Sequence, residues 1–229
     1  MTRGRALAAV LFSCLSLTSE RVASGRPRPG SEPAPERVVR GQTLVSDRDP
    51  RVALEVAPAF RYAGGQRFPL YGVADAEQHL FVDADERGVV RRLFWIQFEH
   101  YLPGKGGEYA YEALPERVRM GPLEFFGDTR VFPGYARGFS TARPGSDGAR
   151  MGDLLRKKGL TLPSTAARAR MFHVPDASRR SELMIIYAEA VAPDDPEALA
   201  LSASGRETSP SLAARVTGHA ASGLTIRGR

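Results

Sequence analysis

Residues 89–102, VVRRLFWIQFEHYL, decide the fold class of this chain. Aromatic and branched residues of this kind favour a β-strand, in which successive side chains point to opposite faces of the sheet. The alternation gives one face with Phe94, Ile96, Phe98, His100 and Leu102, and another with Leu93, Trp95, Gln97, Glu99 and Tyr101. Because both faces carry large apolar groups, we expect a central strand that is covered on both sides.

A second strand precedes this one and is joined to it by a turn. Residues 78–83 are β-prone, and residues 83–88, DADERG, combine acidic turn formers with a glycine. Two β-prone runs joined by a turn that contains Asp and Gly are typical of an antiparallel hairpin. The centre of the sheet is therefore predicted to be antiparallel.

The rest of the chain predicts further strands and a few helices. Further strands are expected at residues 38–45, 52–56, 60–70, 117–120 and 123–126, with a fully buried one at 181–191. Helices are expected at 146–158, 195–201 and 212–221, and a helix or turn at 165–172. Because the strands mostly follow one another along the chain, hairpins are implied rather than strand–helix–strand units.

These elements predict an α+β fold. We expect a mainly antiparallel, twisted sheet of about seven strands with a few helices packed on one face. A single domain is expected over residues 38–201, and a loop, a weak helix and a frayed tail over residues 202–229.

The first residues have the pattern of a cleavable signal peptide. Two basic residues precede an apolar run at 6–17, which is shorter than the roughly 20 residues that span a bilayer. We expect residues 1–24 to be removed on export, so that the protein is periplasmic or secreted. Cys14, the only cysteine, offers lipidation of the leader as a second interpretation.

Residues 25–37 are rich in Pro, Gly and Arg, and they are expected to form a disordered linker. The chain has a formal net charge of +6, but its basic residues are spread along the sequence without a basic run. A nucleic-acid partner is therefore not expected. The only membrane contact that we expect is made through the leader or, alternatively, through a lipid on Cys14.

The clearest candidate binding residues lie on one face of the strand at 89–102. Trp95, Gln97 and Glu99 follow one another on that face at intervals of about 7 Å, and Tyr101 continues the row. Most aromatic residues in such a strip belong to the core, but a strip that combines rings with an amide and a carboxylate also suits a ligand pocket. We therefore predict these residues as candidate ligand contacts.

Two glutamates interrupt otherwise apolar strands. Glu99 and Glu189 each need a partner or a proton if they face a core, because a bare buried carboxylate is costly. Glu189 is therefore added to the candidate ligand-binding residues. The alternative is a structural ion pair, for which the sequence offers Arg168, Arg170 or Arg180.

A metal site is the weaker possibility. His79 and His100 lie on the two arms of the predicted hairpin, but no pair of histidines has the spacing of a metal-binding motif. No cofactor is predicted.

The patterns favour an exported globular domain that binds a small apolar or amphipathic ligand or a partner in the cell envelope. A metal-dependent or acid/base hydrolase-like enzyme that uses Glu99 and His100 is the first alternative. A purely structural envelope protein is the second. An apolar cleft would favour binding, converging histidine and carboxylate groups would favour catalysis, and a flat, fully packed surface would favour the structural role.

Overall fold

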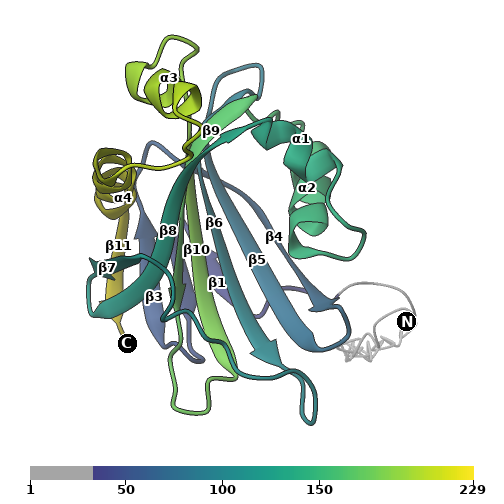
Figure 1. Ribbon diagram of the computed structural model, residues 1–229. Coiled ribbons are helices and arrows are strands. Elements are labelled where there is room, and N and C mark those ends of the chain that lie inside the picture. Colours follow the sequence, from purple (N-terminus) through teal and green to yellow (C-terminus); the bar gives the residue numbers. More distant parts are fainter. Residues whose placement is uncertain (1–32) are drawn as a thin grey trace, which may run out of the picture. The chain divides into compact units, whose positions relative to one another are not determined.

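The predicted hairpin forms the centre of a seven-stranded antiparallel sheet in the computed structural model, which describes residues 33–229 (Figure 1). From one edge to the other the strands are β4 (Arg61–Leu70), β5 (Ala74–Ala84), β6 (Val90–Tyr101), β10 (Ser181–Ala190), β9 (Thr165–His173), β8 (Leu123–Pro133) and β7 (Glu116–Met120). Each strand is antiparallel to its neighbours. The predicted α+β class with a mainly antiparallel sheet is confirmed.

Four shorter strands form a second antiparallel sheet. In order they are β1 (Val38–Arg40), β2 (Thr43–Ser46), β3 (Val52–Val56) and β11 (Leu224–Gly228). The prediction of a frayed tail is wrong for β11, which pairs with β3 along its whole length. Leu224 and Ile226 are the reason, because burial of these two apolar side chains holds the C-terminal strand in the core.

The helices are α1 (Tyr135–Ser140), α2 (Asp147–Lys157), α3 (Pro196–Ala203) and α4 (Pro210–Gly223). The predicted helix at 146–158 is confirmed as α2, and its N-cap is Ser146, whose hydroxyl accepts a hydrogen bond from the backbone N–H of Ala149 at 3.1 Å. None of the helices within residues 33–229 is long and apolar enough to cross a membrane.

Each face of the large sheet carries its own apolar core. On one face, Phe94 and Tyr187 belong to a core that includes Val216 of α4 and residues of the second sheet. On the other face, Trp95 belongs to a core that includes Met151 of α2. Figure 1 shows α1 and α2 on one side of the sheet and α4 on the other. The expectation of helices on a single face is therefore wrong, whereas the central strand is covered on both sides as predicted.

The segment 165–172, predicted as a helix or turn, is the strand β9. It lies between β8 and β10 in the sheet. Ala167 and Ala169 are fully buried in the core on the α4 side, and Arg168 and Arg170 alternate with them. Short alanines have no strong strand preference of their own, so pairing with two neighbouring strands decides the structure here.

The predicted leader, residues 1–24, and most of the predicted linker lie outside the described residues. The end of the linker does not: the backbone N–H groups of Glu36 and Arg37 both donate to the carboxylate of Glu77, at 3.0 and 2.8 Å. The predicted linker, 25–37, therefore extends too far, since its last two residues are bound to the domain.

Candidate ligand-binding site

The polar strip on β6 is a continuous chain of hydrogen bonds. The Trp95 indole N–H donates to Oε1 of Gln97 at 2.9 Å, and the Gln97 amide donates in turn to Glu99. Gln78, from β5, donates to Oε1 of Gln97 at 2.7 Å and to the backbone carbonyl of Asp147 at 3.0 Å. The strip is thus fixed in one arrangement and tied to the start of α2.

Glu99 has a second carboxylate beside it. Glu182, at the start of β10, lies directly opposite Glu99 in the pairing of β6 with β10, so both side chains project to the same face. The Tyr109 hydroxyl donates to Oε2 of Glu99 at 3.0 Å, and the Tyr111 hydroxyl donates to Oε2 of Glu182. The loop between β6 and β7 therefore caps both carboxyl groups.

This pair binds a proton more tightly than free glutamates do. Burial raises the pKa of Glu99 against the lowering effect of its hydrogen bonds from Tyr109 and Gln97. Burial, and next the charge of Glu99, raises the pKa of Glu182. Both shifts follow first from burial, which disfavours the charged form of a carboxyl group.

A row of four aromatic rings covers the carboxyl pair. Tyr101 stacks on Tyr109 with ring centres 4.5 Å apart, Tyr109 lies 6.4 Å from Tyr111, and Tyr111 stacks on Phe172 at 4.1 Å. The rings of each pair are within 17° of parallel. Tyr101, which is predicted as a candidate ligand contact, therefore belongs to this row of rings.

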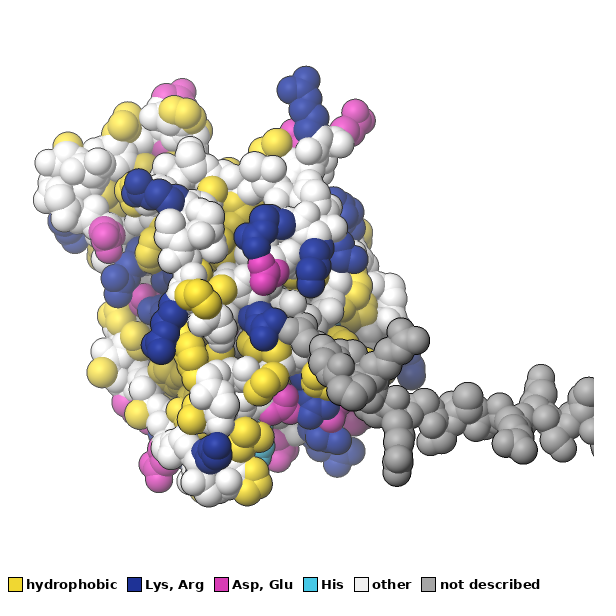
Figure 2. All heavy atoms as spheres, turned by 90° about the vertical axis from the view of Figure 1, so that its right-hand side faces the viewer, with side chains coloured by type: hydrophobic (Ala, Val, Ile, Leu, Met, Phe, Trp, Pro, Cys, Tyr) yellow, Lys and Arg dark blue, Asp and Glu magenta, His cyan; other side chains and the backbone are white. Residues whose placement is uncertain are grey.

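A groove of about 480 Å³ lies next to the strip, between α1, the start of α2 and the face of the large sheet. Trp95, Met184 and Ile186 line it from the sheet, and Tyr135 and Phe139 line it from α1. Figure 2 looks onto the side of the molecule where α1 and α2 lie and shows Lys and Arg side chains spread among hydrophobic ones. Of the predicted candidates, Trp95 alone lines this groove.

Two residues that line the groove each have a buried polar atom without a hydrogen-bond partner among the described residues. These atoms are the hydroxyl of Tyr135, a residue that is only 5% exposed, and Nε of Arg168. The guanidinium of Arg168 stacks over the ring of Phe132, 4.1 Å from its centre. Burial, and next the charge of Arg170, lowers the pKa of Arg168 to about 10, so the group remains a cation at neutral pH.

Glu189 lies on the opposite face of the sheet. It accepts hydrogen bonds from the Tyr187 hydroxyl at 2.9 Å and from Arg215 of α4 at 2.9 Å, and its Oε2 lies 2.7 Å from Nδ1 of His219. The arginines suggested by the sequence are not its partners. Glu189 therefore does not join the strip of Trp95, Gln97 and Glu99.

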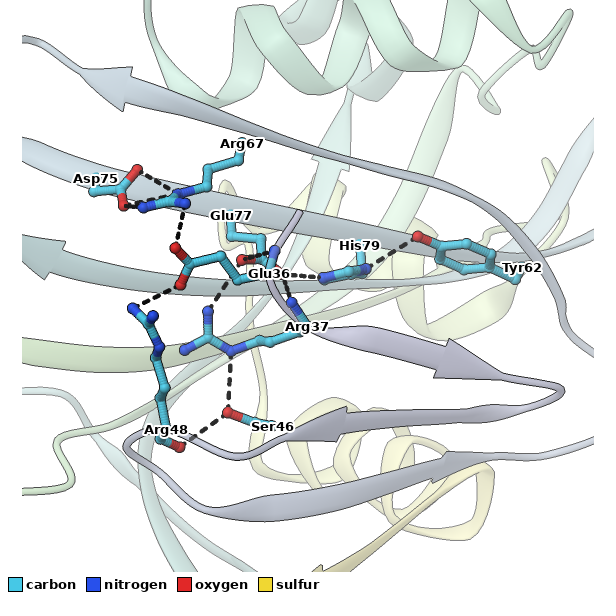
Figure 3. A network of polar contacts seen from close by, with 9 residues as sticks. All are labelled: Glu36, Arg37, Ser46, Arg48, Tyr62, Arg67, Asp75, Glu77 and His79. Carbon is cyan, nitrogen blue, oxygen red and sulfur yellow. Dashed lines mark hydrogen bonds and ion pairs between the residues drawn. The ribbon is translucent and has the colours of Figure 1, made fainter. Parts of the chain in front are cut away.

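His79 belongs to a buried network on that same opposite face (Figure 3). Nδ1 of His79 is 3.0 Å from the Tyr62 hydroxyl, and Nε2 is 2.8 Å from Glu77. Figure 3 shows how Arg37 reaches the same carboxylate from the start of the described chain, and the two groups form an ion pair at 3.2 Å. Both ring nitrogens of His79 are thus occupied.

Glu77 is held as a carboxylate by this network. Burial alone would raise its pKa, but hydrogen bonds from His79 and from the backbone of Glu36 and Arg37 outweigh burial, and the pKa falls to about 2. The guanidinium of Arg37 also stacks over Phe98, 3.7 Å from the ring centre. The network fastens the first described residues to the sheet.

His100 lies apart from His79. The hairpin pairs His79 with Ile96 and His100 with Asp75, so the two histidines are separated by about 13 Å along the strands. Nδ1 of His100 is 2.8 Å from the hydroxyl of Ser181. Within residues 33–229, no group of three or more His, Cys, Asp or Glu side chains is arranged to hold a metal ion.

Sequence patterns did not assign three residues to this site, namely Glu182, Arg168 and Tyr135. Glu182 stands at the start of a strand, where the sequence alone suggests solvent. Arg168 lies in the segment expected to be a helix or turn, so its face could not be assigned. Its alternation with Ala167 and Ala169 is the signal that could have placed it on a strand. Tyr135 begins the short helix α1, which no sequence pattern predicts.

In the comparison with known proteins, no family model, curated protein or solved structure matches the chain.

Proposed function

We propose that this protein is an exported domain that binds a small amphipathic molecule in the groove between α1, α2 and the large sheet. The observation that carries the proposal is the lining of the groove. Trp95, Phe139 and Ile186 offer aromatic and aliphatic surface, and polar groups stand at a few fixed positions among them. This is the usual composition of a small-molecule site.

The size of the groove supports a ligand of modest dimensions. Its volume of about 480 Å³ falls within the range of roughly 300–1,000 Å³ that is common for ligand pockets. The cavity around Arg37 and Glu77, by contrast, is lined mainly by charged and polar side chains. The groove beneath α1 therefore offers a ligand more apolar contact than the cavity around Arg37 and Glu77 does.

The rigid floor of the groove also supports binding. The indole of Trp95 is fixed by its hydrogen bond to Gln97, and Gln97 is held by Gln78. A site that is already ordered loses less conformational entropy when a ligand arrives. The long hydrogen-bonded strip thus serves to hold the aromatic wall in position.

Geometry favours binding over the hydrolase-like alternative. Adjacent residues of a strand project to opposite faces, and Glu99 and His100 are adjacent on β6. Glu99 lies beneath Tyr109, whereas His100 contacts Ser181. The two groups therefore do not converge on a common point where a substrate atom could be placed.

The proposal can be tested by comparing how a neutral dye binds to the wild-type protein and to a variant whose groove is blocked. Gly138 lines the groove from α1, and a Cβ atom there would meet no heavy atom within 4 Å. Gly138→Phe should therefore fold while placing a ring at the groove. Gly218→Phe is the matched control, because Gly218 is also an open helical glycine but lies on α4.

The measurement is a titration with N-phenyl-1-naphthylamine, followed by the emission of the dye. We expect saturable binding to the wild-type protein and to Gly218→Phe, and binding at least tenfold weaker to Gly138→Phe. Equal binding to all three proteins, or no saturable binding, would refute the groove as the site.

Export is the second part of the proposal. It is supported by the basic start and the short apolar run of residues 1–24, which have the composition of a signal peptide. Full-length protein expressed in a bacterial host should be recovered outside the cytoplasm with an N-terminus near Gly25. Recovery of cytoplasmic protein that retains Met1 would contradict it.

A further inference from the structure

We propose that the groove selects ligands that carry a carboxylate, which Arg168 and Tyr135 bind. This inference rests on the proposed function, because it names the head group of a molecule whose body occupies the same groove. Its basis is the pair of buried donors that no described residue satisfies, Nε of Arg168 and the hydroxyl of Tyr135. Both residues line the groove.

Arg168 lies near one carboxylate, Asp128, but makes no hydrogen bond to it with Nε. The charges of Arg130, Arg168 and Arg170, on β8 and β9, all act on the single carboxylate of Asp128. Its oxygens are taken by Arg170, at 2.8 and 3.0 Å, and by Arg130, at 3.1 Å. Nε of Arg168 is left without a hydrogen-bond partner in the part of the chain that the structure describes.

A guanidinium whose Nε is buried without a hydrogen bond has room for a further partner. Buried guanidinium groups are nearly always paired, since leaving one unsatisfied costs free energy. An exposed arginine finds its partner in water, but Nε of Arg168 is buried, and the residue lines the groove. The stack of Arg168 on Phe132 fixes the plane of the guanidinium, so its N–H groups keep one direction.

A carboxylate matches both donors. An ionised carboxylate has only acceptor sites, and its two oxygens fit the N–H groups of an arginine and the O–H group of a tyrosine at once. The hydroxyl of Tyr135 is a donor and not an anion, because burial raises its pKa well above the ordinary value. Asp147 also lines the groove and would repel a second acidic group elsewhere on the ligand. The favoured ligand is therefore a monocarboxylate with an apolar body.

Matched acid and amide probes separate this inference from the proposed function. Two pairs are used, decanoate with decanamide and naphthalene-1-acetate with naphthalene-1-acetamide, and each is titrated by calorimetry at pH 7. We expect each acid to bind at least tenfold more tightly than its amide. In Arg168→Met that preference should vanish while amide binding stays within twofold of wild type.

Two further variants complete the test. Tyr135→Phe removes only the hydroxyl and should reduce the preference for the acid by several-fold without loss of folding. Arg130→Met is the control, because Arg130 lies opposite Arg168 on β8 but is already paired with Asp128 and does not line the groove. Its preference should equal that of wild type.

Each outcome is decisive. Acids and amides that bind equally well overturn the carboxylate inference and leave the proposed function intact. If no probe of either pair binds, the carboxylate inference is overturned, and the dye titration decides the proposed function separately. A preference that persists in both Arg168→Met and Tyr135→Phe would place the head group elsewhere and refute this site. If Arg168→Met does not fold, Arg168→Gln and Tyr135→Phe carry the same test.

Discussion

Glu99 and Glu182 face each other directly across β6 and β10, and each carboxyl group accepts a hydrogen bond from a tyrosine of the same loop. Two acids in such a position cannot both be ionised without strong repulsion. Burial first, and for Glu182 the charge of Glu99 next, raises the pKa of both acids, which favours a proton on this pair beneath the rings of Tyr109 and Tyr111. This makes the stability of the protein depend on pH in a defined direction.

We predict that the protein becomes less stable as the pH rises from 5 to 9. The pKa of Glu182 is raised in the folded state, first by burial and then by Glu99. Because the pKa is higher in the folded state, protonated Glu182 contributes its full stabilisation below its pKa in the unfolded state. That contribution is lost as the pH rises through its pKa in the folded state. Glu77, whose pKa is lowered to about 2, changes its contribution only in acid and so lies outside this range.

The variant Glu182→Gln isolates this effect. Its amide oxygen still accepts the Tyr111 hydrogen bond, but the side chain carries no charge. We expect its melting temperature to fall less than that of the wild-type protein between pH 5 and pH 9. At pH 9 its free energy of unfolding should exceed that of the wild-type protein by a few kcal/mol. If the melting temperatures of the two proteins changed equally with pH over this range, the carboxyl pair would not hold a proton.

We predict that Trp95→Ala lowers the free energy of unfolding by about 3–5 kcal/mol. Trp95 is 4% exposed and packs against Phe139 of α1, with ring centres 6.2 Å apart. Removing the indole leaves a cavity and also frees Oε1 of Gln97 from one of its donors. Chemical denaturation measures the loss. Leu199→Ala, at a site 54% exposed on α3, is the control and should change stability by less than about 0.5 kcal/mol.

The buried network around His79 gives a third prediction. A Cβ atom at Gly65 would lie 2.7 Å from the Tyr62 hydroxyl and 2.9 Å from Nδ1 of His79, both closer than real contacts allow. Gly65→Ala must therefore push these two groups apart, and we expect a loss of about 1–3 kcal/mol. Gly107→Ala, where a Cβ atom meets nothing within 4 Å, should be neutral in the same thermal melts. An equal effect of both substitutions would show that the network has no special role.

Truncation can test whether the domain begins at Glu36, as the structure indicates, or at Val38, as the sequence predicts. A chain that begins at Glu36 should melt like a chain that begins at Gly25, because its backbone still reaches Glu77. A chain that begins at Val38 loses Arg37 and leaves the Glu77 carboxylate with fewer partners. We expect it to be less stable by roughly 3 kcal/mol. Equal melting temperatures for the two chains would show that the first described residues are not anchored.

The central hairpin could be predicted from the sequence because its pattern is local. Alternation along residues 89–102 assigns Trp95 and Glu99 to one face and Phe94 to the other, and the pairing with β5 confirms this assignment. The buried strand at 181–191 is equally clear, since a short, unbroken apolar run of β-prone residues is typical of a strand inside a sheet.

The partners of these residues could not be predicted in the same way. Glu182 meets Glu99 only because β10 lies next to β6, although the two residues are far apart in the chain. The pairing of Glu189 with Arg215 depends on where α4 packs, and the position of Arg168 depends on the strand β9, whose alanines suggest a helix. Pairings across a sheet are long-range properties, and single-sequence patterns carry little information on them.

The most direct test of binding in the groove is the indole N–H resonance of Trp95 in a ¹H–¹⁵N spectrum. Trp95 is the only tryptophan of the chain, so this resonance reports on one place alone. We predict that N-phenyl-1-naphthylamine shifts the indole signal of the wild-type protein and of Gly218→Phe in a saturable way, and leaves the signal of Gly138→Phe unmoved. An indole signal that stays in place while the dye is bound by the wild-type protein would contradict the account.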